Sequence, residues 1–129
     1  MKLFCHFQIK PQELINYTFD WKSSLAEDHP EFTILEADNH SEPFLIQQTS
    51  QLMIASEILI VFFDVLEDQN LGTLSKALEA IRQRKGNITV LLNGENQLIN
   101  KSLKLLRQVP IRFEDAQQAL NVINRSIQS

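Results

Sequence analysis

Short apolar runs alternate with longer amphipathic stretches along this chain. The clearest run covers residues 58–63, where six apolar residues stand in a row before Asp64. A strand with one face in water would alternate apolar and polar residues, so this run predicts a strand that is buried on both faces. Strands of that kind occur in parallel sheets that helices cover on both sides.

Four more segments have the composition of strands, and helical spacing of apolar residues marks the segments between them. Strands are predicted at residues 2–8, 32–38, 87–93 and 109–113, and helices at residues 11–28, 44–56, 71–85, 98–106 and 116–127. Pro11 suits a first helical turn. The alternating pattern of residues 32–38 and the proline at position 110 favour edge positions for these two strands.

The order of strand and helix is thus repeated five times. Strands that are separated by helices are largely parallel and are joined by right-handed crossovers. This predicts a three-layer α/β/α, doubly wound fold with a five-stranded, mainly parallel sheet. The flavodoxin-like strand order 2-1-3-4-5 fits the polar second strand best. Residues 1–129 are predicted to form a single domain of this kind.

Composition narrows the class of protein. With 43% hydrophobic and 22% charged residues and a net charge of −4, the chain resembles an ordinary globular protein and lacks the basic surface of a nucleic-acid binder. The single cysteine, Cys5, excludes an intrachain disulfide and is expected to be buried. No apolar segment has the length of a membrane span, and the first residues do not form a signal peptide. A cytoplasmic protein without membrane contact is therefore expected.

The carboxyl ends of parallel strands meet at one edge of the sheet, where folds of this kind bind ligands. Strand ends and the loops after them supply a candidate ligand-binding rim of Gln8, Asp38, Asp64, Asp68, Gly72, Thr73, Asn93 and Gly94. Glu114 would extend this acidic edge, with Lys10 nearly its only positive charge. Only three glycines occur in the chain, and none forms a phosphate-binding motif, so a nucleotide held by its phosphates is not expected. No cofactor, metal or catalytic residue is predicted, and Asp64 either caps a turn or faces a ligand.

Residues 64–72 resemble the loop that follows the phosphoacceptor strand of two-component receiver domains. There too an aspartate ends the third strand and a glycine opens the next helix. Receivers also carry paired acids after the first strand, where this chain has Gln8 and Lys10, and a Ser or Thr and a Lys at the positions of Asn93 and Glu114. The resemblance therefore implies a receiver-like domain that has lost phosphoryl transfer.

A second resemblance covers more of the chain. Residues 54–86, with Ser56-Glu57 before the buried strand and Gly72-Thr73 before the next helix, resemble the nucleoside 2-deoxyribosyltransferase and TIR-like group, as do Phe113-Glu114-Asp115 and the last helix. The resemblance implies a flavodoxin-type fold. However, Lys76 stands where that pattern has its nucleophilic glutamate, and Glu79 is nearly one helical turn away. Because an ammonium group cannot replace a carboxylate nucleophile in glycosyl transfer, this activity is not expected.

The remaining candidates are side chains with two interpretations. Tyr17, Phe19 and Trp21 either form an interface or belong to the core, and the basic residues around Arg84 are expected to neutralise a helix end. His29 and His40 lack the spacing of zinc ligands.

Three functions remain open. The first is a non-catalytic binding or interaction module for a protein or small molecule, with a homodimer as an option. The second is an enzyme on a nucleoside-like or sugar-like substrate that uses Asp64, Asp68 or Glu79 as acid or base. The third is a degenerate receiver-like signalling domain. A raised carboxylate pKa in a pocket would favour the enzyme.

Overall fold

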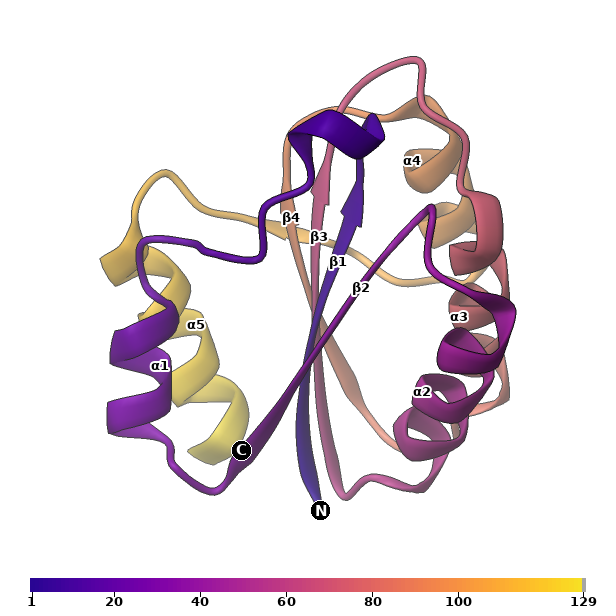
Figure 1. Ribbon diagram of the computed structural model, residues 1–129. Coiled ribbons are helices and arrows are strands. Elements are labelled where there is room, and N and C mark those ends of the chain that lie inside the picture. Colours follow the sequence, from indigo (N-terminus) through magenta and orange to yellow (C-terminus); the bar gives the residue numbers. More distant parts are fainter. Residues whose placement is uncertain (129) are drawn as a thin grey trace.

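The sheet has the predicted architecture. The computed structural model describes residues 1–128 and contains a five-stranded sheet with the order β2-β1-β3-β4-β5, in which every pairing is parallel (Figure 1). The strands are β1 (Lys2–Ile9), β2 (Phe32–Asp38), β3 (Ile58–Val65), β4 (Ile88–Asn93) and β5 (Ile111–Arg112). The flavodoxin-like fold class predicted from the sequence is therefore confirmed.

Helices cover both faces of the sheet and complete the three layers. Figure 1 shows α1 (Lys22–Asp28) and α5 (Ala116–Gln128) on one face, and α2 (Pro43–Ala55), α3 (Ser75–Gln83) and α4 (Gln97–Leu105) on the other. Two short 3-10 helices, η1 (Gln12–Leu14) and η2 (Gly72–Leu74), lie in the connections. No helix in residues 1–128 is long and apolar enough to cross a membrane.

Each face of the sheet has its own apolar cluster. Because side chains alternate along a strand, Leu3, Cys5 and Phe7 of β1 pack toward α2, α3 and α4, whereas Phe4 packs toward α1 and α5. The five residues from Leu59 to Phe63 in β3 are at most 2% exposed. The central run is therefore buried on both faces, as its composition predicts.

The strand register sets the position of the polar residues. Gln8 lies between Asp38 on β2 and Asp64 on β3, and Asp64 lies beside Asn93 on β4. One step below this row, His6 lies between Glu36 and Phe62. Both rows alternate with Cys5 and Phe7, so they face α1 and α5 near the carboxyl edge.

The helix predicted for residues 11–28 is wrong over most of its length. The chain forms η1, then an irregular segment over residues 15–20, and becomes α-helical only at Lys22. The Asn16 side chain accepts a hydrogen bond from the backbone N–H of Thr18 at 3.0 Å, and the N–H of Asn16 donates to Gln8 Oε1 at 3.0 Å. An asparagine that bonds locally in this way competes with helical hydrogen bonding.

Arg84 stabilises a helix end, but not the end of its own helix. Its Nη1 donates to the carbonyls of Met53 at 2.8 Å and Ser56 at 2.7 Å, at the carboxyl end of α2. Its Nη2 and Nε reach the carbonyls of Glu57 and Asn87. Burial lowers the pKa of the guanidinium. Arg84 thus joins the ends of α2 and α3 at the entrances to β3 and β4.

Candidate functional site

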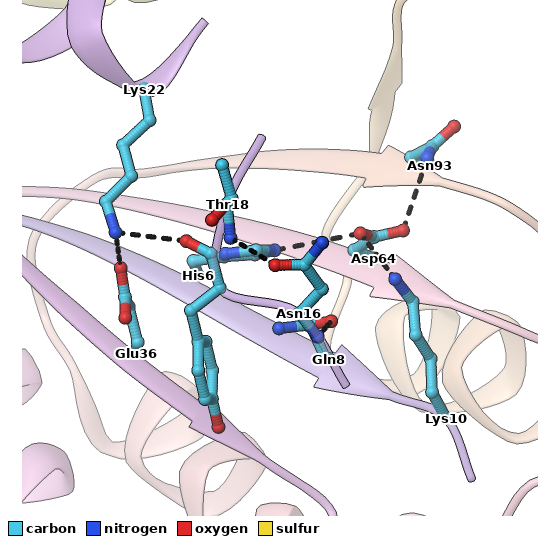
Figure 2. A network of polar contacts seen from close by, with 10 residues as sticks. His6, Gln8, Lys10, Asn16, Thr18, Lys22, Glu36, Asp64 and Asn93 are labelled. Carbon is cyan, nitrogen blue, oxygen red and sulfur yellow. Dashed lines mark hydrogen bonds and ion pairs between the residues drawn. The ribbon is translucent and has the colours of Figure 1, made fainter. Parts of the chain in front are cut away.

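Asp64 is the centre of a polar network at the carboxyl edge of the sheet. Figure 2 shows its carboxylate between the side chains of Lys10, Asn93 and His6. Lys10 Nζ donates to Oδ2 at 2.8 Å, and Asn93 Nδ2 donates to Oδ1 at 3.2 Å. His6 Nε2 lies 3.7 Å from Oδ2, too far for a hydrogen bond but close enough for an electrostatic contact.

These contacts keep Asp64 ionised. Burial acts to raise the pKa of Asp64, but the imidazole of His6 and the ammonium group of Lys10 outweigh it, so the pKa lies below its ordinary value. A carboxyl group with a lowered pKa is a weak proton acceptor and is not protonated at neutral pH. Asp64 is therefore suited to holding a positive charge or a hydrogen-bond donor, not to acid catalysis.

Two buried polar side chains beside Asp64 are incompletely hydrogen-bonded. Both ring nitrogens of His6 and Nε2 of Gln8 have no hydrogen-bond partner within the described part of the chain, although both residues are 0% exposed. The His6 ring stacks on Phe62 with centroids 4.9 Å apart and contacts the edge of Phe19 at 4.8 Å. Buried polar atoms without partners are uncommon and costly, so these atoms mark a place where a further donor or acceptor would be stabilising.

Residues 15–20, which we name the covering segment, lie across this polar row. Tyr17 donates its hydroxyl hydrogen to the Asp38 carboxylate, and the carbonyl of Tyr17 accepts a hydrogen bond from Lys22 at 3.0 Å. Lys22 also pairs with Glu36 on β2 (Figure 2). Burial, together with the hydrogen bond to and charge of Asp38, raises the pKa of Tyr17. Side-chain contacts from β1 and β2 thus anchor the covering segment in place of helical hydrogen bonds.

A cavity of about 250 Å³ opens beside the network. It lies between the covering segment, the ends of β3 and β4, and the loop from β5 to α5. Four aromatic residues line it, Phe19, Trp21, Phe62 and Phe113. Four acidic residues also line it, Asp20, Asp64, Glu114 and Asp115, and Asn93 and Ala116 complete the lining. Trp21 is only 4% exposed and belongs to the core beneath this cavity.

The predicted rim residues divide into two groups. Gln8, Asp38, Asp64 and Asn93 form one continuous row across four strands. Asp38 is held in a local turn, since its Oδ1 accepts a hydrogen bond from the N–H of His40 at 2.7 Å. Only Asp64 and Asn93 of this row reach the cavity lining.

The other four predicted rim residues shape loops away from the cavity. A Cβ atom on Gly72 would lie 2.0 Å from the Asn39 carbonyl oxygen, and one on Gly94 would lie 2.1 Å from the Val65 carbonyl oxygen. Thr73 Oγ1 donates to the Ser41 carbonyl at 2.7 Å. Asp68 has a positive φ of 59° in the loop after β3 and lines a separate pocket. Close backbone approach accounts for the two glycines.

Glu79, the candidate substitute nucleophile, lies on the face opposite the cavity. It is on α3, which packs against the other side of the sheet, and it is paired with Arg82. The hydrogen bond from Arg82 lowers the pKa of Glu79. Glu79 and Asp64 therefore cannot act on one substrate.

The sequence placed Asn93 and Lys10 at the same edge as Asp64, but it gave no sign that His6 lies beside this carboxylate. The strand order and register supply that proximity, because His6 precedes Gln8 by two residues on the strand next to β3. Phe19 and Phe113 reach the cavity from irregular segments, for which the sequence pattern gives no direction.

Comparisons with known proteins add no assignment. The chain matches no family model, no curated protein and no solved structure. Within residues 1–128, no three His, Cys, Asp or Glu side chains are grouped closely enough to hold a metal ion. The function has to be inferred from the network and the cavity themselves.

Proposed function

We propose that this domain is a non-catalytic binding module that holds a small molecule at the carboxyl edge of its sheet, beside Asp64. One observation carries the proposal: Asp64 joins the cavity to a polar network in which buried atoms of His6 and Gln8 have no hydrogen-bond partner within residues 1–128. His6 and Gln8 do not line the cavity, so a ligand reaches this network through Asp64 and Asn93, which do. The edge is also where doubly wound folds bind their ligands.

The charge state of Asp64 supports binding over catalysis. An enzyme that used this carboxyl as a general acid would need a raised pKa, whereas the pKa of Asp64 is lowered. The Oδ2 atom is occupied by the Lys10 ammonium group, which weakens it as a nucleophile. The second carboxylate considered for catalysis, Glu79, lies on the other face of the sheet.

A thermal-shift screen with matched variants tests this function. The compounds are nucleosides, nucleotides, sugars, amines and divalent cations. We expect one class to raise the melting temperature of the wild type by several degrees, and Asn93→Ala to reduce that rise. Asn87→Ala is the control. Both asparagines are exposed, but Asn93 is the last residue of β4 at the carboxyl edge, whereas Asn87 directly precedes β4 at the opposite edge of the sheet.

The proposal fails if no class of compound stabilises the protein. It also fails if the stabilising compound acts equally on both asparagine variants and its amide NMR shift changes avoid the ends of β1, β3 and β4.

An apolar surface at the end of α4 supports a second candidate function, protein interaction. Val109 is 85% exposed and lines a cavity of about 480 Å³ together with Leu92 and Leu103. Leu105 is 84% exposed and lines a neighbouring cavity of about 190 Å³ with Leu78 and Leu106. Exposed apolar side chains beside a cavity are typical of interaction surfaces. Analytical ultracentrifugation of the wild type and of a Leu105→Gln, Val109→Gln double variant tests whether this surface joins two copies of the chain.

A further inference from the structure

The cavity beside Asp64 combines aromatic rings with negative charge, and this combination indicates a class of ligand. The inference rests on the proposed binding function and concerns the same site. The rings of Phe19, Trp21, Phe62 and Phe113 pack as one cluster, with centroid separations from 4.5 Å for Phe19 and Trp21 to 5.8 Å for Trp21 and Phe113. Trp21 and Phe62 are buried beneath the cavity, whereas Phe19 and Phe113 are partly exposed in its wall.

The rim of the cavity carries carboxylates and no lysine or arginine among the residues that line it. Asp20, Glu114 and Asp115 are exposed at its mouth, and Asp64 stands inside. Asp115 also caps α5, because its Oδ1 accepts a hydrogen bond from the N–H of Gln118 in the first turn of that helix. A cavity of this charge attracts a cation and repels a phosphate or carboxylate.

The surroundings of Asp64 indicate what this carboxylate accepts. An ammonium group, that of Lys10, already occupies Oδ2, while Oδ1 has only the 3.2 Å hydrogen bond from Asn93, which also lines the cavity. The fully buried imidazole of His6 points at the same carboxylate without a hydrogen-bond partner within residues 1–128. Oδ1 is therefore the oxygen of this carboxylate that can accept a further hydrogen bond from a donor in the cavity, independently of the acidic residues at the mouth.

The lining suits an organic cation better than a metal ion. The acidic side chains stand around the cavity, and within the described chain no three of them converge as metal ligands would. Aromatic rings also add nothing to the binding of a hard metal ion, whereas they attract ammonium groups and cover the carbon atoms attached to them.

We infer that the cavity binds a small organic ammonium compound. Its positive charge lies among Asp64, Glu114 and Asp115, and its carbon atoms contact the rings of Phe19 and Phe113. The volume of about 250 Å³ admits a small molecule of this kind.

Fluorescence of Trp21 reads out this binding directly, because Trp21 lines the cavity and is the one tryptophan of the chain. The probes are choline, putrescine and the neutral analogue of choline in which a tert-butyl group replaces trimethylammonium. We expect choline or putrescine to give a saturable change with a Kd of about 1 mM or lower. The neutral analogue should bind at least tenfold more weakly, and added salt should weaken choline and putrescine alone.

Charge-neutral variants locate the effect. Glu114→Gln with Asp115→Asn removes two charges at the cavity and keeps the helix cap, since asparagine accepts the same hydrogen bond. We expect this pair to weaken the cation by about two- to fivefold for each charge removed. Glu27→Gln with Asp28→Asn removes two exposed charges from α1 outside the cavity and should leave the affinity within twofold.

The possible outcomes distinguish two claims, that the ligand is a cation and that this cavity is the binding site. Equal binding of choline and its neutral analogue, or equal effects of the two charge-neutral pairs, overturns the assignment of a cation while the site itself stands. No saturable response to choline and putrescine overturns the assignment as well. The binding function is judged separately, by the thermal-shift screen and the location of its NMR shift changes.

Discussion

The ion pair between Lys10 and Asp64 offers a quantitative test of the network. Its nitrogen–oxygen distance is 2.8 Å, and the two side chains are 15% and 17% exposed. A second pair, Arg112 with Glu95, has nearly the same distance of 2.9 Å, but its side chains are 47% and 61% exposed. The two pairs differ in burial as well as in residue type, and the exposed pair provides a comparison within the same chain.

Burial sets the expected size of each effect. Exposed ion pairs contribute about 0.2 to 1 kcal/mol to stability, whereas removal of one partner from a buried pair costs about 3 to 5 kcal/mol. Lys10 and Asp64 lie between these limits, so we expect Lys10→Met or Asp64→Asn to lower the free energy of unfolding by about 1 to 3 kcal/mol. The coupling free energy between the two substitutions should be about 1 to 2 kcal/mol.

Urea unfolding of the four proteins in each double-mutant cycle measures the coupling. For the exposed pair, Arg112→Met and Glu95→Gln should couple by less than about 0.5 kcal/mol. If the two cycles give the same coupling free energy, burial does not strengthen the Lys10–Asp64 contact and the reasoning is refuted.

Four other substitutions or measurements test separate parts of the structure. Arg84→Lys should lower the free energy of unfolding by about 2 kcal/mol, because lysine cannot replace the guanidinium hydrogen bonds to four carbonyls, two of which are partly buried. Arg82→Lys, on an exposed pair, should change the free energy of unfolding by less than about 0.5 kcal/mol in the same urea titration. The pKa of Asp64 is lower in the folded protein than its ordinary value of 3.8. The ionised carboxylate therefore stabilises the folded state fully above pH 3.8, and this stabilisation is lost as the pH falls through the lower pKa of the folded state. The difference in unfolding free energy between wild type and Asp64→Asn should therefore be constant above pH 3.8 and shrink below it, and a difference that grows with acidity would contradict the lowered pKa. Arg107→Gly should raise the free energy of unfolding by about 1 kcal/mol, and with it the melting temperature. The reason is that Arg107 has a φ of 58°, a conformation that is strained for a residue with a side chain but not for glycine. A lower melting temperature would show that the side chain contributes more to stability than the strain costs. The Cys5 thiol is 0% exposed and burial raises its pKa, so a thiol reagent should label it only at the rate of unfolding.

Periodicity was sufficient for the sheet and its order. The apolar run from Leu59 to Phe63 predicts a central strand because only a strand with two covered faces accepts such a sequence. The row of Gln8, Asp64 and Asn93 follows from parallel strands alone, since these residues lie at or next to the carboxyl ends of neighbouring strands.

Periodicity was misleading where long-range hydrogen bonds decide the backbone. Residues 14–25 have helical spacing, yet Asn16 donates its N–H to the side chain of Gln8 and Tyr17 bonds to Asp38. Neither contact leaves a trace in local sequence, because both partners come from strands. The walls of the cavity, which depend on the covering segment, were therefore beyond sequence reasoning.

The buried atoms of His6 and Gln8 are likewise visible only with coordinates. A histidine and a glutamine in an alternating apolar strand can equally well face water or a partner. The register places them beneath the covering segment, where both His6 ring nitrogens and Gln8 Nε2 have no hydrogen-bond partner among the described residues.

The central claim is that a small molecule binds at the carboxyl edge beside Asp64. Amide NMR shift mapping tests it most directly, with the compound that gives the largest thermal stabilisation added to the labelled protein. We predict shift changes concentrated at the ends of β1, β3 and β4, in residues 15–21 and in the loop before α5. Changes concentrated on α2, α3 and α4, which cover the opposite face of the sheet, would contradict the claim.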